Sequence, residues 1–370
     1  MDFSFTDDQR AIAELTGQIL TDHCRLDRVK AVEASADRYD AELWAACATA
    51  GLLGAALPEA IGGSGGGFVE ICLILEQQGR RVAPIPLVAS LVSAAMPLAR
   101  FGSQAQQQRW LPSLIEGSVL LTAALTEQGA DSRTPATVAT ADGHGWRLTG
   151  VKVGVPIAQR AAAVLVPART AGGQIAVFIV DPTAAGVRLA PQEPTNWEPQ
   201  ARTELSDVVV GPEAVLGSVA QGAEILNWII DHTTVALCAI AAGACQEALR
   251  ITAEYACTRK QFGKPIGTFQ AVGQRLADAY IDNETVNLTM WQAASRLADE
   301  MPSAKEVAVA KYWAAEGGSR IAHAALHIHG GMGIDVDYPI HRYFLWIKQI
   351  ENTLGAATPQ LVRLGALLAA

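Results

Sequence analysis

The spacing of apolar residues divides the chain into three zones. In the first zone, residues 1–117, apolar positions recur at intervals of three and four, which predicts helices. Thr6 and Gln9 have the spacing of a capping box at the start of the first helix. Glycine and proline at 57–68 and 80–87 interrupt the pattern. The sequence therefore predicts an N-terminal helical domain over residues 1–117.

The middle zone, residues 118–218, consists of short β-prone runs separated by turn-rich segments such as ADGHG and RTAGG. This pattern predicts an antiparallel β-sandwich or barrel. Helical periodicity then returns, so residues 219–370 are expected to form a C-terminal four-helix bundle. The predicted fold class is α+β, in the order helical domain, antiparallel β-domain, helical bundle. The four helical runs are 220–256, 268–298, 303–326 and 338–369.

Composition predicts a large core and limits the partners. Half of the residues are hydrophobic and 18% are charged, while the net charge is −9 and the pI is near 5.3. This acidity argues against a broad nucleic-acid or anionic-membrane surface. The N-terminus lacks a signal-peptide pattern, and the longest apolar run, 235–245, is too short to span a bilayer. Because the six cysteines form no CxxC pair, we expect free thiols in a soluble, cytoplasmic protein.

A basic turn, TRKQFGKPIGTFQ at 258–270, stands between two of the helical runs. Arg259, Lys260 and Lys264 could form a local cationic pocket, and an arginine suits bidentate contact with a phosphate. A solvated cluster at a helix end fits the same spacing equally well. The turn is therefore a candidate anion site with an open alternative.

Two longer segments resemble the acyl-CoA dehydrogenase family. They are YACTRKQFGKPIGTFQAVGQRLADAYID and, about sixty residues later, HIHGGMGIDVDYP. GLLGAALPEAIGGSGGG, ALTEQGADS and LTGVKVG extend the resemblance over nearly the whole chain. The resemblance implies an acyl-CoA dehydrogenase-like fold, FAD clamped between subunits and an acyl-CoA thioester substrate. In this family a carboxylate removes the proton α to the thioester carbonyl while hydride passes to the flavin.

The resemblance places the catalytic base at one of two positions, and neither holds a carboxylate in this chain. Counting from the GGMG loop puts Leu354 where most members carry a glutamate. Counting back from Arg259 puts Thr233 where a minority carry it. Glu351 lies about one helical turn before Leu354 and is expected to be a solvated or intersubunit residue rather than a base. No catalytic residue is therefore predicted here.

The segments that would hold the chain's own flavin and substrate depart from the family pattern. Gly154-Val155-Pro156 replaces a Trp-Ile-Thr run beside the flavin ring, which removes an aromatic wall and a hydroxyl. The loop at 126–132 keeps only part of its motif. In a helix that usually contacts CoA, Asp231 is retained but Thr234 replaces an arginine.

By contrast, the residues that family members donate across the dimer to the partner's FAD are present, with histidine for glutamine at 327. This combination resembles the smaller, base-lacking subunit of actinobacterial heterotetrameric (α2β2) dehydrogenases that act on steroid side-chain CoA thioesters. The implied partner is a base-bearing homologue, and the implied electron acceptor is an electron-transfer flavoprotein or a similar protein. The residues implied to contact FAD are Arg259, Gln261, Phe262, Ile266, Phe269, His327, Gly330 and Gly331.

Other interpretations of these residues remain open. His327 and His329 have the spacing of a metal pair, but no nearby carboxylate or cysteine cluster supports one, so no metal site is predicted. A self-sufficient homomeric enzyme would use Glu351 or Asp231 as its base. A non-enzymatic binding protein on the same scaffold is the third alternative. Flavin content separates them: colour in the chain alone favours the homomer, colour only with a partner favours the subunit, and no colour favours the binding protein.

Overall fold

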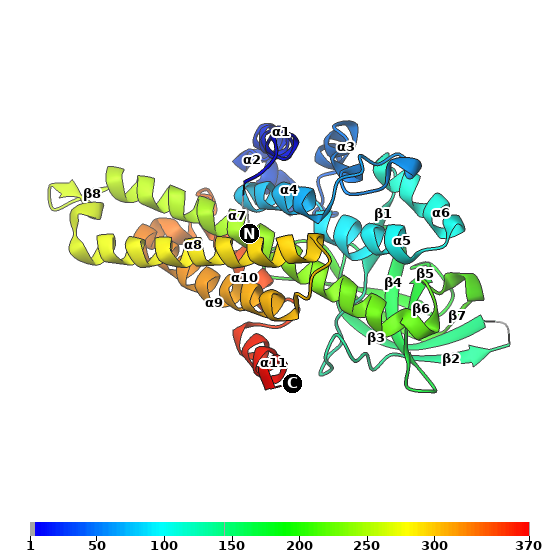
Figure 1. Ribbon diagram of the computed structural model, residues 1–370. Coiled ribbons are helices and arrows are strands. Elements are labelled where there is room, and N and C mark those ends of the chain that lie inside the picture. The colour runs from blue at the N-terminus through cyan, green and yellow to red at the C-terminus, as the bar shows by residue number, and fades with distance from the viewer. Residues whose placement is uncertain (1–3, 144, 370) are drawn as a thin grey trace. The chain divides into compact units, whose positions relative to one another are not determined.

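The computed structural model describes residues 4–143 and 145–369 (Figure 1). The predicted order of helices, sheet and helical bundle is confirmed. By internal contacts the chain forms two compact units. The first contains the chain up to Ala31, Phe68–Ala83 and everything from Thr234 onward, and the second contains Val32–Gly67 and Pro84–Thr233.

The first unit is a helical bundle. The capping box predicted at Thr6 is confirmed: its side chain accepts from the Gln9 N–H, and the Gln9 side chain accepts from the Thr6 N–H. In the bundle α9 packs against α8, α10 and α11, and Figure 1 shows α8 and α9 as long neighbouring helices. The helices that contribute to this unit are α1 (Asp7–His23), α2 (Leu26–Ala34, in part), α4 (Phe68–Arg81), α7 (Gly222–Thr258, from Thr234), α8 (Gln270–Ala298), α9 (Ala304–His329), α10 (Ile340–Asn352) and α11 (Ala357–Ala369).

Two glycines let α4 and α7 cross in direct backbone contact. A Cβ added at Gly79 would lie 2.0 Å from the Ile240 carbonyl oxygen, and one added at Gly243 would lie 1.9 Å from the Glu76 carbonyl oxygen. Any side chain at either position would therefore force the two helices apart.

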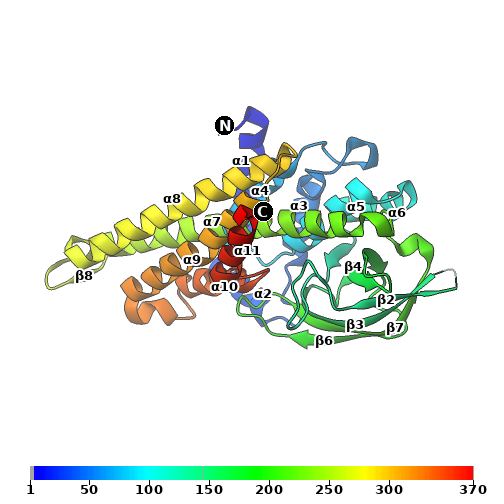
Figure 2. The ribbon, with the colours of Figure 1, turned by 60° about the horizontal axis from the view of Figure 1, so that its bottom comes forward.

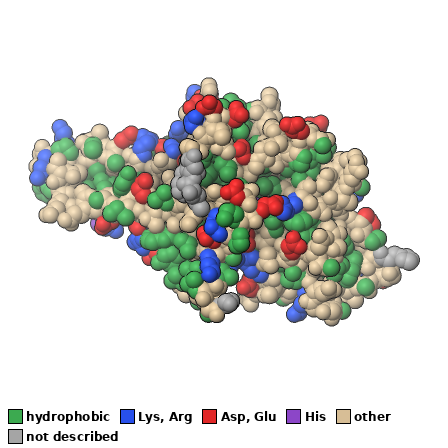
Figure 3. Space-filling view, in the orientation of Figure 1, with side chains coloured by type: hydrophobic (Ala, Val, Ile, Leu, Met, Phe, Trp, Pro, Cys, Tyr) green, Lys and Arg blue, Asp and Glu red, His purple; other side chains and the backbone are tan. Residues whose placement is uncertain are grey.

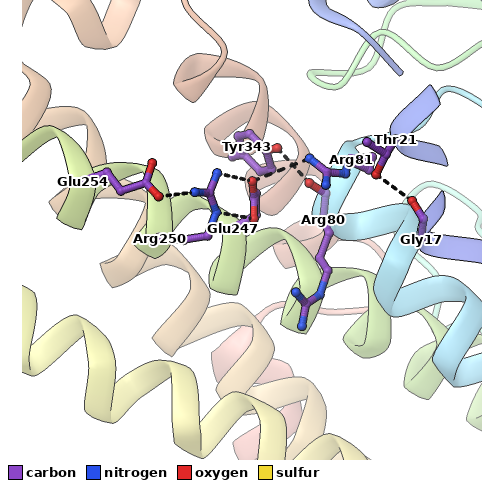
Figure 4. Close-up of polar contacts among 8 residues, drawn as sticks. All are labelled: Gly17, Thr21, Arg80, Arg81, Glu247, Arg250, Glu254 and Tyr343. Carbon is purple, nitrogen blue, oxygen red and sulfur yellow. Dashed lines mark hydrogen bonds and ion pairs between the residues drawn. The ribbon is translucent and has the colours of Figure 1, made fainter. Parts of the chain in front are cut away.

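A buried acid links α7 to α4, and a tyrosine links α10 to α4 (Figure 4). The Glu247 carboxylate accepts from Arg250 at 2.7 and 2.9 Å and lies 3.8 Å from Arg81. Nearby, the Tyr343 hydroxyl donates to the Arg80 carbonyl oxygen at 2.8 Å. Charge and hydrogen-bond partners thus accompany the buried Glu247, as burial of a carboxylate requires.

The run predicted as one helix at 338–369 is two helices. Leu354 and Gly355 take φ values of 55° and 96°, left-handed conformations that an α-helix cannot contain. The end of α10 is held by Lys311, whose Nζ donates to the carbonyl oxygens of Ile350 (2.7 Å) and Glu351 (3.0 Å). Burial lowers the pKa of Lys311 to about 8.

The second unit is built on a seven-stranded sheet, in which β3, β7 and β6 lie side by side (Figure 2). Its core is formed by side chains such as Leu148, Val164, Phe178 and Val208. The strand order is β1-β4-β2-β3-β7-β6, with β5 paired to β4. The strands are β1 (Leu120–Ala123), β2 (Val138–Asp142), β3 (Gly145–Pro156), β4 (Ala161–Thr170), β5 (Ile175–Val180), β6 (Val187–Gln192) and β7 (Gln200–Val210).

The sheet is mixed rather than wholly antiparallel. Strand β1 pairs with residues 161–165 of β4 and β2 with residues 169–170, and both pairings are parallel. The two strands follow one another along β4, and residues 124–137 loop out between them. The chain therefore runs in the same direction as β4 in both strands. The remaining helices of this unit are α3 (Ala41–Thr49), α5 (Met96–Phe101), α6 (Gln104–Ile115) and the π-helical η3 (Val88–Ala95).

Among the described residues, one helical stretch, Val219–Thr258, is long and apolar enough to cross a membrane by length and composition. Of its apolar window, 78% is buried inside the protein, as expected for the core helix of a soluble fold.

Candidate functional site

The turn between α7 and α8 forms the tip of the helical bundle (Figure 1). Strands β8 (Lys260–Gln261) and β9 (Lys264–Pro265) make a small hairpin. Its base is closed by a hydrogen bond of 2.8 Å from the Ile266 N–H to the Arg259 carbonyl oxygen. At the turn Phe262 takes a φ of 52°, and its side chain is 93% exposed. The tip is thus a hydrogen-bonded hairpin rather than an irregular loop.

The predicted contact residues of this turn lie together on the tip, where basic and apolar side chains gather in Figure 3. The ring of Phe262 meets that of Phe269 edge to face at 6.2 Å. The Lys264 ammonium lies 4.6 Å from the Phe269 ring centre. Arg259 and Gln261 are exposed, and within residues 4–143 and 145–369 the Arg259 guanidinium has no hydrogen bond or ion pair. The tip therefore exposes the Arg259 cation and the Phe262 ring.

The second predicted motif lies at the end of α9. His327 is exposed, and Gly330 begins the short helix η7 (Gly330–Ile334) with a φ of 58°. A Cβ added at Gly330 or Gly331 would meet no atom within 4 Å. These glycines therefore leave backbone open toward the outside instead of relieving an internal contact.

Side-chain contacts that the sequence did not predict join the two motifs. Tyr255, one turn before Arg259, stacks on His329 with ring centres 4.4 Å apart. The His329 Nε2 accepts from the Tyr338 hydroxyl at 3.1 Å, and burial lowers the pKa of His329. Arg275 of α8 contacts His327, Nη1 to Nδ1, at 2.6 Å. The turn at Gly330 and Gly331, here called the glycine turn, and the tip are thus parts of one surface.

The structure places no free carboxylate in the segment around the first predicted base position. Leu354 is half-buried in the break between α10 and α11. The Glu351 carboxylate accepts from the Lys348 ammonium at 2.5 Å and is 19% exposed. Glu351 is therefore held in a local ion pair.

The second predicted base position, Thr233, is buried. Thr233 is 5% exposed and shares a hydrogen bond of 2.9 Å with Ser93. Asp231, two residues earlier, accepts from Arg133 at 2.5 Å, and Arg133 also donates to Asn227 at 2.6 Å. Asp231 is therefore held in an ion pair with Arg133.

The altered segment Gly154–Pro156 lies in β3 beside a buried ion pair. Gly154 takes a φ of 59° and donates its N–H to the Gln192 side chain at 2.8 Å. The Lys152 ammonium lies 2.6 Å from a Glu127 oxygen, and both side chains are almost fully buried. Glu127 also accepts from the Thr137 hydroxyl at 2.6 Å, so the loop after β1 is anchored to the sheet.

Comparison with known families gives the identification. Residues 6–118 match the family "Acyl-CoA dehydrogenase, N-terminal domain". Residues 220–363 match the family "Acyl-CoA dehydrogenase, C-terminal domain". The chain belongs to the acyl-CoA dehydrogenase family, whose members are FAD-dependent oxidoreductases.

Three individual relatives cover nearly all of the chain. The acyl-CoA dehydrogenase FadE27 of Mycobacterium tuberculosis is 40% identical over 377 aligned positions, which cover 100% of this chain and 99% of the relative. The ChsE4–ChsE5 complex of Mycobacterium tuberculosis contains a chain with 41% identity and a TM-score of 0.95, with 100% and 99% of the two chains covered. A structure of the Tcur3481–Tcur3483 steroid acyl-CoA dehydrogenase has 44% identity and a TM-score of 0.92, with 98% of each chain covered.

The residues of the tip suit the ADP half of FAD. The exposed Arg259 guanidinium suits a pyrophosphate, the exposed ring of Phe262 suits a planar base, and open glycine backbone permits close approach of a ligand. FAD would supply hydride acceptance where it is bound. The Gly154–Pro156 segment does not suit the flavin ring, because it presents no aromatic side chain and the Gly154 N–H is already used by Gln192.

Proposed function

We propose that this chain is the base-lacking subunit of a heteromeric acyl-CoA dehydrogenase and that it completes the FAD site of a base-bearing homologue. The observation that carries the proposal is the contrast between the exposed residues of the tip and the residues at the predicted base positions. Arg259 is exposed without an ion pair among the described residues, and Phe262 is exposed beside Phe269. Glu351 and Asp231 are ion-paired, and the base positions hold Leu354 and Thr233. A chain that has residues for contact with a cofactor but no base is suited to complete the FAD site of another subunit.

The relatives support a proposal for the partner and the substrate. One related structure is a complex of two differently named chains, and another is called a steroid acyl-CoA dehydrogenase. We therefore assign the chain to an α2β2 assembly that dehydrogenates steroid side-chain CoA thioesters in the cytoplasm. An electron-transfer flavoprotein or a similar protein takes up the electrons. The contact set for the partner's FAD is the eight residues of the tip and the glycine turn, and the chain divides functionally at residues 117 and 218.

Co-expression with a base-bearing homologue is expected to give a yellow α2β2 complex with one FAD for each pair of unlike subunits. The chain alone is expected to bind FAD poorly, since Gly154–Pro156 leaves its own flavin segment without an aromatic wall. Flavin absorbance and the mass of the intact assembly measure both. Two FAD for each pair, or a yellow chain purified alone, would contradict the proposal.

Replacing Arg259 with alanine is expected to deplete FAD from the complex. A charge-assisted contact to pyrophosphate is worth about 1.5–3 kcal/mol, or roughly ten- to a hundredfold in the dissociation constant. FAD release can be followed by flavin fluorescence. Arg147→Ala, which removes an equal charge from an exposed pair with Asp142, is the control and should retain FAD. Unchanged FAD affinity in Arg259→Ala would remove the tip from the FAD site.

A further inference from the structure

The contact between Arg275 and His327 determines which nitrogen of the histidine carries hydrogen. Arg275 Nη1 lies 2.6 Å from His327 Nδ1. A guanidinium has only donors, so Nδ1 must be the acceptor. The hydrogen of the neutral His327 ring is therefore on Nε2.

Three other helical histidines have the opposite arrangement. In each, Nδ1 lies within hydrogen-bond distance of the backbone carbonyl oxygen four residues earlier. Since a carbonyl can only accept, Nδ1 carries the hydrogen in these rings. His327 would have the same option with the carbonyl of His323, but Arg275 occupies its Nδ1 instead. The three pairs are His232 with Trp228 (2.9 Å), His323 with Ser319 (2.7 Å) and His329 with Ala325 (2.8 Å).

The Nε2–H of His327 is left for a ligand. His327 is exposed, and among the described residues its Nε2 has no hydrogen-bond partner. Arg275 borders a groove of about 800 Å³ between α8 and α9 that Asp278 also lines. Within the described part of the chain Arg275 forms no ion pair with that aspartate, and His327 is its hydrogen-bond partner.

We propose that Arg275 is a positioning residue that turns His327 into an outward Nε2–H donor for an acceptor atom in the ADP half of the partner's FAD. This inference rests on the proposed function, which places that FAD beside the glycine turn. Without Arg275, His327 donates its Nδ1–H to the His323 carbonyl and presents a bare Nε2 to the cofactor. The bare Nε2 of His327 and the FAD atom are then both acceptors, so no hydrogen bond forms between them.

The tautomer can be measured directly, without activity and without FAD. In the full chain carrying ¹⁵N- and ¹³C-labelled histidine, ring chemical shifts distinguish Nε2–H from Nδ1–H. At about pH 8.5, where free imidazole is neutral, wild type should show Nε2–H at His327. Arg275→Ala should show Nδ1–H. The reverse assignment in wild type, or no change in Arg275→Ala, overturns the proposal; His327→Gln identifies the resonance.

A double-mutant cycle tests the consequence for FAD in the co-purified complex. Arg275→Ala should raise the FAD dissociation constant roughly two- to tenfold, the effect of one ordinary hydrogen bond. In the His327→Gln background, where the amide donates without a tautomer, adding Arg275→Ala should change the FAD dissociation constant little. Arg275→Lys, which keeps a donor, should recover part of the loss.

The outcomes separate this inference from the function on which it rests. An equal loss from Arg275→Ala in both backgrounds means that the arginine acts on its own, and no loss in either means that His327 is not a contact; both overturn the proposal. Failure of the proposed function would instead appear as Arg259→Ala retaining FAD, and the ring shifts of His327 still decide its tautomer.

Discussion

Replacing Lys152 with methionine is expected to lower the free energy of unfolding by about 3–5 kcal/mol, the usual effect of removing one partner from a buried ion pair. Lys152 Nζ lies 2.6 Å from Glu127 and 2.7 Å from the Pro167 carbonyl oxygen, and its side chain is 1% exposed. Methionine fills similar volume but leaves the Glu127 carboxylate buried beside an apolar group. The loss therefore comes from the uncompensated charge.

Urea unfolding followed by circular dichroism measures the change, and an unaltered slope would show that only stability has changed. The control is Arg147→Met, which breaks the exposed pair with Asp142 and should cost at most about 1 kcal/mol. Lys152→Met combined with Glu127→Gln should recover part of the loss, because no charge then remains buried. Equal stability of Lys152→Met and wild type would show that the pair contributes nothing.

Acid should act on the same pair. Burial by itself raises the pKa of Glu127, but the charge of Lys152 and hydrogen bonds from Lys152 and Thr137 outweigh it and hold the pKa below its ordinary value. A carboxyl whose folded pKa is depressed stabilises the fold above its unfolded pKa. That contribution is lost as pH falls through the folded value, and Glu127→Gln should remove this part of the acid sensitivity.

Local sequence signals predicted the features that depend on a few neighbouring residues. The capping box at Thr6, the helical bundle and the projecting turn at Arg259 all follow from spacing within one or two turns of chain. The break at Leu354 did not, because the end of α10 is held by a contact from a distant helix, the hydrogen bond from Lys311 to the Ile350 carbonyl oxygen at 2.7 Å.

Contacts between distant segments could not be predicted from periodicity. Arg275 and His327 are 52 positions apart, and nothing in either helix pattern indicates that the two side chains meet. The parallel pairing of β1 and β2 with β4 likewise depends on where the 124–137 loop leaves the sheet. The resemblance to a family supplied positions for a site, and the structure supplied the hydrogen-bond roles.

Catalysis by the complex is expected to depend on a carboxylate of the partner and to be almost indifferent to the acids of this chain. Loss of a base to an amide removes proton transfer, commonly a factor of about 10² to 10⁴ in rate. Glu351→Gln and Asp231→Asn should each stay near wild type, because both carboxylates lie in ion pairs, with Lys348 and Arg133, at 2.5 Å. Substituting the partner's base by its amide should give the full loss.

Dye reduction by the co-purified complex with a steroid-CoA thioester distinguishes these results, provided that flavin absorbance is recorded for every variant. Losing FAD would lower the rate without touching proton transfer, so each rate is divided by bound flavin. Glu351→Gln removes a charge from a half-buried local pair, which costs at most about 1 kcal/mol in stability and leaves the fold intact for the assay. A loss of a hundredfold or more in Glu351→Gln or Asp231→Asn, with FAD still bound, would mean that this chain carries its own catalysis.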